Sequence, residues 1–174
     1  MRKSLVLTVI GDDRPRIVEA LADQVLAAGA NWEESRMARL AGKFAGLLRV
    51  SVEADRASEL ARGLTALQGG LTVVVEETDE APASAGRVVR LELVGNDHPG
   101  IIRDISRALA LQSINIEELE TGVASAPMSG ELLFRARALV RLPPSVTVES
   151  LRLHLEAVAG ELMVDLDVEH VAVE

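Results

Sequence analysis

An internal repeat with an offset of 84 residues is the feature that most constrains the fold of this chain. The segment 11–18, with sequence GDDRPRIV, resembles the segment 95–102, GNDHPGII. The same offset places 31–34, NWEE, on 115–118, NIEE, with no gap between the two blocks. Coincidence rarely preserves register over such a stretch, so the sequence predicts two copies of one structural unit.

Each copy begins with the pattern of a strand, a turn and a helix. A β-rich run, 5–10 or 88–94, ends at a glycine and is followed by Asp-x-Pro. We expect the aspartate to cap a helix N-terminus and the proline to occupy the first helical turn. Apolar residues at helical spacing follow, and Gly29, with Ser113 as a weaker counterpart, is expected to end the helix.

The rest of each copy predicts two strands, a helix and a last strand, at 31–40, 44–52, 56–67 and 71–76 and at 115–123, 131–141, 149–159 and 162–173. The order βαββαβ is typical of an α+β, ferredoxin-like unit, in which both helices cover one face of a four-stranded antiparallel sheet. The polar, small-residue stretch 77–86 marks a boundary. We therefore expect a first domain at 1–78, a linker at 79–86 and a second domain at 87–174.

The composition argues against several classes of function. The net charge is −9 and neither half has more basic than acidic residues, which disfavours direct nucleic-acid binding. Aromatic residues make up only 2%, so the core is expected to be aliphatic, and an RNA-binding module that stacks bases on aromatic side chains is disfavoured. The chain contains no cysteine, which excludes disulfides and thiol catalysis. No stretch predicts a membrane span, so a cytoplasmic location without membrane contact is expected.

Motifs for catalysis are lacking, which predicts a protein that is not an enzyme and that uses no metal or cofactor. His154 and His170 have no partner recognisable from sequence, and His98 follows Asp97 but is matched by Arg14 in the first copy. No phosphate-binding loop or metalloprotease motif is present. The pairs Glu33-Glu34 and Glu117-Glu118 occupy adjacent positions in predicted strands. Side chains alternate between the faces of a sheet, so each pair is expected to point to opposite faces.

The Gly-x-Asp-x-Pro turn is the best candidate site, because backbone N–H groups at a helix N-terminus suit a small carboxylate. Asn31 and Asn115 open the next strand and offer both donors and acceptors. The residues alone leave open a second interpretation, in which these side chains only cap helices or form turns.

These motifs carry a resemblance to a known family. The sequence DHPGII, a helix of about fifteen residues and then INI resembles the signature of ACT domains, ferredoxin-like modules that bind amino acids. The tandem organisation resembles the group of glycine cleavage system transcriptional repressors. In ACT domains, ligands commonly lie between paired domains, at the first turn of one and near the second strand of its neighbour.

The expected ligand-binding residues are Gly11, Asp12, Asp13, Asn31, Gly95, Asn96, Asp97, Gly100, Ile101, Asn115 and Ile116. In the first copy, Arg16 stands where the second has Gly100, so that site is either degenerate or uses Arg16 to hold a carboxylate.

The resemblance implies an accessory repressor that responds to a small amino acid, glycine above all. Such a protein would act through a separate DNA-binding transcriptional activator and without touching DNA itself. An alternative is a ligand-binding regulatory subunit of an amino-acid metabolic enzyme, since the sequence of a sensor domain does not encode its client. A sheet with helices on one face leaves another surface open, so a homodimer is expected.

Overall fold

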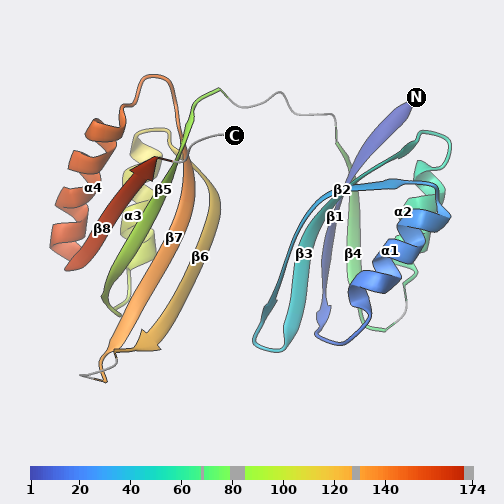
Figure 1. The fold of residues 1–174 in the computed structure, drawn as a ribbon, viewed down its shortest axis with the longest axis horizontal. Coiled ribbons are helices and arrows are strands. Elements are labelled where there is room, and N and C mark those ends of the chain that lie inside the picture. The colour runs from blue at the N-terminus through green and yellow to red at the C-terminus, as the bar shows by residue number, and fades with distance from the viewer. Residues whose placement is uncertain (68, 79–84, 127–129, 171–174) are drawn as a thin grey trace. The chain divides into compact units, whose positions relative to one another are not determined.

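The computed structural model describes residues 1–67, 69–78, 85–126 and 130–170, and it contains two βαββαβ units (Figure 1). The compact units comprise 1–82 and 83–174. Most of the expected linker, at 79–84, lies outside the described residues, so its limits stay a prediction. In the part of the chain that is described, no helix is long and apolar enough to cross a membrane.

The first unit contains β1 (Arg2–Asp12), α1 (Ile17–Ala27), β2 (Asn31–Leu40), β3 (Lys43–Glu53), α2 (Ala57–Thr65) and β4 (Thr72–Thr78). Its strands pair antiparallel in the order β2-β3-β1-β4. Both helices lie against one face of the sheet (Figure 1), and we call the other face the open face. The central strand β1 therefore leads directly into the candidate turn at one end of the sheet.

The second unit repeats this topology with β5 (Arg87–Asn96), α3 (Ile101–Leu111), β6 (Asn115–Ser125), β7 (Leu132–Leu142), α4 (Val148–Leu162) and β8 (Val164–His170). The strand order is β6-β7-β5-β8. The α+β, ferredoxin-like fold class predicted from the sequence is confirmed. The last strand is shorter than predicted, because α4 extends to Leu162 and Met163 ends it in the left-handed conformation. Residues 171–173 of that prediction lie outside the described residues.

Each unit has its own aliphatic core between the helices and the sheet. Alternate residues of the central strands, such as Leu5, Leu7 and Val9, are buried, as are apolar residues of α1 at helical spacing. Removing such side chains from water contributes about 25 cal/mol per Å² of apolar surface, so this alternation determines which face the helices cover. The expected aliphatic core is confirmed.

The start of each first helix differs from the prediction. The helices begin at Ile17 and Ile101, and the residue before each, Arg16 or Gly100, is left-handed, with φ of 73° and 105°. No side chain caps either N-terminus, so the expected aspartate caps and the prolines in the first turn are wrong. The chain uses Asp-x-Pro to make a turn, and it enters the helix through one left-handed residue.

Gly11 and Gly95 are required by the packing of the central strands. A Cβ atom on Gly95 would lie 2.5 Å from Val164 Cγ1 and 2.9 Å from Val164 Cα. On Gly11 it would lie 2.8 Å from the carbonyl oxygen of Gly70. Backbone atoms cannot move aside as a flexible side chain can. Only glycine therefore allows the strand to approach the neighbouring backbone this closely.

Replacing Gly95 with alanine should therefore lower the free energy of unfolding by about 1–3 kcal/mol, the usual cost of overpacking a core. Gly122→Ala is the matched control in the same unit, because a Cβ atom there meets no described atom within 4 Å. We expect the control to change stability by less than about 0.5 kcal/mol. Urea denaturation of the three proteins measures the difference, and equal stabilities would contradict the role assigned to Gly95.

Candidate functional site

The turn between β5 and α3 contains most of the expected site residues of the second unit. Gly95 and Asn96 end β5, and residues 97–100 form the turn. The side chains of Ile101 and Ile116 point away from it, because Ile101 is only 1% exposed in the core and Ile116 packs against the same cluster. The polar groups available at this turn are therefore those of Asn96, Asp97 and the backbone.

Asp97 is held by its backbone and not by its side chain. Its N–H donates a hydrogen bond of 2.9 Å to the carbonyl oxygen of Leu132. Among the described residues, no hydrogen bond or ion pair engages the carboxylate, which is exposed. No side chain caps the first N–H groups of α3 by a hydrogen bond, and the nearest side-chain atoms to a Cβ atom built on Gly100 are Arg103 Nη2 at 3.5 Å and Asp104 Oδ2 at 3.6 Å. The φ of 105° at Gly100 means that any other residue there would also strain the backbone.

The corresponding turn of the first unit is occupied by ion pairs. Asp13 forms an ion pair with Arg39, whose Nε lies 2.6 Å from its Oδ2, and Arg16 Nε lies 2.7 Å from a carboxylate oxygen of Glu19. Lys43 hydrogen-bonds Asp12 and thereby lowers the pKa of this carboxyl group. A shallow depression of about 480 Å³ remains beside this turn, lined in part by Asp13 and Arg16. The two turns share their backbone path but differ in the charges available to a ligand.

Asn31 and Asn115 lie at the opposite end of the sheet from the turns. Asn31 pairs with Ser51 of β3, which pairs with Ser4 near the start of β1, whereas Asp12 ends that strand. Eight residues at about 3.3 Å each place these positions about 26 Å apart. The second unit has the same register, with Asn115 opposite Arg141 and Val88. A single unit therefore does not bring the turn and the asparagine together, and the role of each in binding stays a prediction.

The prediction that adjacent glutamates point to opposite faces is wrong. The register of β2 shifts between Trp32 and Glu34, so Glu33 is the extra residue of a β-bulge. Arg49 contacts both carboxylates, with Nε 3.6 Å from Glu33 and Nη2 3.8 Å from Glu34. A bulge interrupts the alternation of side chains and places two neighbours on the same face. The second unit has the same bulge between Ile116 and Glu118.

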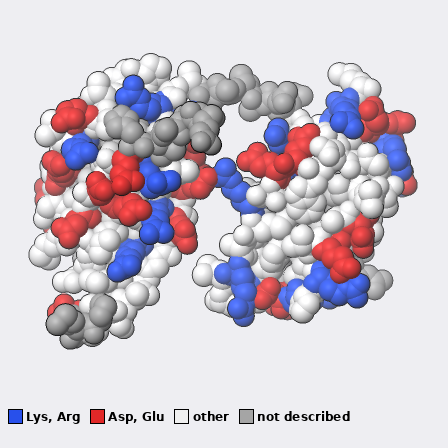
Figure 2. Space-filling model, in the orientation of Figure 1, with Lys and Arg blue, Asp and Glu red and all other residues white. Residues whose placement is uncertain are grey.

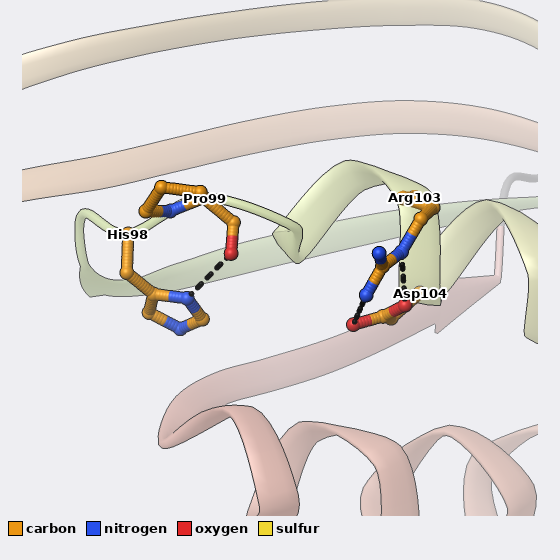
Figure 3. A network of polar contacts seen from close by, with 4 residues as sticks. All are labelled: His98, Pro99, Arg103 and Asp104. Carbon is orange, nitrogen blue, oxygen red and sulfur yellow. Dashed lines mark hydrogen bonds and ion pairs between the residues drawn. The ribbon is translucent and has the colours of Figure 1, made fainter.

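His98 connects the turn of the second unit to α4. Its Nδ1 lies 3.1 Å from the carbonyl oxygen of Pro99, and its Nε2 lies 3.0 Å from that of Leu162, the last residue of α4. Figure 3 shows the ring folded back toward Pro99, with the Arg103–Asp104 pair further along α3. Carbonyl oxygens only accept, so a ring that donates to both must carry two protons.

The charge of His98 is therefore coupled to the fold. The hydrogen bond to Leu162, then that to Pro99, raises the pKa of His98 above its ordinary value, and the carboxylates of Asp97 and Asp104 add to this effect. Arg103 in turn lowers the pKa of Asp104 by a hydrogen bond. Sequence analysis missed this residue, since its only signal was the neighbouring Asp97. Arg14 occupies the same position in the first unit, and its guanidinium packs against Gly69. A Cβ atom on Gly69 would lie 1.8 Å from Arg14 Nη2.

A raised pKa in the folded state predicts the sign of a pH effect on stability. The contribution of His98 is present in full below the ordinary histidine value of about 6.5, and it is lost as the pH rises through the raised pKa. We expect the melting temperature to fall across this interval, and to fall less in His98→Gln. His154→Gln, on an exposed position of α4, is the control. Identical pH profiles of wild type and His98→Gln would contradict this assignment.

Comparisons with known proteins agree with this architecture. The sequence model of the ACT domain matches residues 3–76, which span the first unit from β1 into β4. The first unit therefore belongs to the ACT-domain family. The 84-residue repeat and the shared strand order give the second unit the same fold.

Two similarities extend over nearly the whole tandem. The chain is 26% identical over 164 residues to the glycine cleavage system transcriptional repressors of Escherichia coli and Shigella flexneri, with 91% of this chain and 85% of each relative covered. A solved structure from Galdieria sulphuraria, described as an unknown protein, is 32% identical, with a TM-score of 0.88 over 99% of this chain and 100% of that one. The two-unit fold of this chain is thus shared with the whole Galdieria sulphuraria structure, and the sequence similarity to the repressors covers 85% of each of them.

Proposed function

We propose that this tandem ACT-domain protein is a non-catalytic regulator that senses a small amino acid, with glycine as the first candidate. Its similarity to the glycine cleavage system transcriptional repressors of two bacteria supports a role as an accessory repressor of that system. In this proposal, the ligand binds at the turn of the second ACT domain.

The observation that carries the proposal is the unpaired carboxylate of Asp97 beside the open N-terminus of α3. A free amino acid presents an ammonium and a carboxylate only one carbon apart. The N–H groups and the dipole of α3 suit the carboxylate, and Asp97 offers an acceptor to the ammonium. In the first domain, Arg39 already holds the equivalent Asp13. The second turn is therefore the better candidate.

The proposed repressor acts through protein contacts with a separate DNA-binding activator. The chain is acidic overall, with a net charge of −9. On the face seen in Figure 2, basic and acidic side chains are interspersed in both domains and form no continuous basic surface among the described residues. Binding of a phosphate backbone requires such a surface, so a protein partner fits these charges better.

Calorimetric titration of glycine, serine and alanine into the full chain tests ligand binding. Asp97→Asn keeps the size of the side chain but removes the charge that would meet the ammonium. Loss of a hydrogen bond between charged groups costs about 1.5–3 kcal/mol, which corresponds to about a 10- to 150-fold weaker affinity. The matched control Asp13→Asn should retain most of the affinity, because Arg39 occupies that carboxylate. Equal affinity in wild type and Asp97→Asn would place the ligand elsewhere.

The client is tested separately by capture from native extract on the immobilised full chain, with and without glycine. Recovery of a DNA-binding regulator in a glycine-dependent manner supports the proposal. Recovery of an enzyme of amino-acid metabolism instead favours the alternative of a regulatory subunit.

We also propose that the protein forms a homodimer through the open face of the first sheet. Ile10, Leu47 and Val74 lie on this face and are 49–51% exposed. By strand register, the equivalents of Leu47 and Val74 in the second domain are Arg137 and Asp167. This part of the open face is thus apolar in the first domain and charged in the second, which supports its being covered in the assembled protein.

Replacing Leu47 with arginine, which imitates the second domain, should weaken self-association by at least about tenfold, since each 1.4 kcal/mol of lost apolar burial corresponds to that factor. Leu40→Arg is the control, because Leu40 is 80% exposed near the tip of a hairpin. Light scattering over a concentration series measures the effect. A monomeric wild type at micromolar concentrations would refute the proposed dimer.

A further inference from the structure

A row of polar side chains crosses the first sheet at the end remote from the turn. Strand register aligns Asn31 of β2, Ser51 of β3, Ser4 of β1 and Thr78 of β4. A groove of about 540 Å³ is lined by the three members of this row on β3, β1 and β4, and also by Arg49 and Glu33. A cavity of this volume is large enough for a small metabolite.

Three buried polar atoms at this groove have no hydrogen-bond partner among the described residues: Ser4 Oγ, Ser51 Oγ and Arg49 Nε. Ser51 is only 8% exposed, and it is the one buried polar residue in the part of the chain that the structure describes. Leaving a buried donor or acceptor unpaired costs about 1–3 kcal/mol, and more if the group is charged. Three such groups together at one groove indicate a site where a ligand satisfies their hydrogen bonds.

The chemistry of the groove matches both ends of a zwitterion. Arg49 Nε–H and the two serine hydroxyls are donors that suit a carboxylate. Glu33 supplies an acceptor close by, since its carboxylate lies 3.6 Å from Arg49 Nε, beyond hydrogen-bond distance. The bulge at Glu33 brings this carboxylate to the side of the sheet where Arg49 lies.

The equivalent positions of the second domain carry different side chains. The positions of Ser4 and Ser51 are occupied there by Val88 and Arg141. Arg141 hydrogen-bonds Glu117, the counterpart of Glu33, through both Nε and Nη2, with 3.2 Å for the second contact. In the second domain an arginine hydrogen-bonds the bulge glutamate, whereas in the first Arg49 reaches Glu33 and Glu34 only at 3.6 and 3.8 Å, and the two serine hydroxyls have no hydrogen-bond partner among the described residues.

We propose that the groove of the first ACT domain is a second binding site, specific for a small α-amino acid. Its carboxylate is held by Arg49 and the hydroxyls of Ser4 and Ser51, and its ammonium by Glu33. The side chains of Arg2 and Lys3 at the rim are 60% and 42% exposed, so they can rotate to admit the ligand. This site is independent of the turn in the second domain, and each can exist without the other.

Amide chemical shifts of the isotope-labelled full chain give a separate signal for each site. We expect glycine, serine or alanine to shift the amides of residues 4, 33, 49 and 51, and acetate or methylammonium alone to shift them at least tenfold less at equal concentration. Shifts at 97–101 report the turn of the second domain, so failure of one site is distinguishable from failure of the other. No shift at the groove with any of the three amino acids, or equal shifts with acetate, overturns this proposal.

Two variants test the assignment to these side chains. The double variant Ser4→Ala with Ser51→Ala should bind at least tenfold more weakly, yet melt at the same or a higher temperature, because it removes unpartnered buried hydroxyls. Ser51→Arg should pair with Glu33, as Arg141 does with Glu117, and abolish binding at the groove. Ser58→Ala, exposed on α2, is the control. Unchanged binding in both variants, or a lower melting temperature of the double variant with unchanged binding, contradicts the site.

Discussion

The close approach of each central strand to the segment beside it is the constraint on which the rest of each domain depends. At Gly95 a Cβ atom would lie 2.9 Å from the backbone of Val164, and Gly11 meets the backbone of Gly70 in the same way. This contact fixes where the central strand ends and where the turn begins. The left-handed residue at 16 or 100 then directs the chain into the helix. The position of the helix N-terminus, and with it the candidate ligand site, follows from this packing.

The two domains use one backbone for different surface chemistry. In the first, ion pairs occupy the turn, while two serine hydroxyls and Arg49 Nε have no hydrogen-bond partner among the described residues at the far end of the sheet. In the second, the turn keeps a free carboxylate, and the Arg141–Glu117 pair fills the far end. A repeat that is symmetrical in topology is thus asymmetrical in the places where a small polar molecule could bind. We infer that each domain uses a different part of its surface to bind a ligand.

His98 links one of these places to the stability of its domain. The ring joins the turn to the last carbonyl group of α4, and its protonated form satisfies both contacts. The same imidazolium lies beside the carboxylate of Asp97, which acts on its charge. Binding at the turn and protonation of His98 are therefore expected to influence each other, because a charge close to an ionisable group shifts the pKa of that group.

The sequence by itself determined the repeat, the βαββαβ order and the aliphatic core. These depend on register, on the alternation of residues such as Leu5, Leu7 and Val9, and on helical spacing, all of which are local. It also singled out the two turns, through glycine and Asp-x-Pro. What only the tertiary structure decided is which polar groups meet. Asn31 is separated from Asp13 by the length of the sheet, and a bulge brings Glu33 to Arg49. His98 reaches a carbonyl group 64 residues away. Such contacts depend on pairing between distant strands and on departures from regular alternation. The local sequence pattern predicts neither of these features.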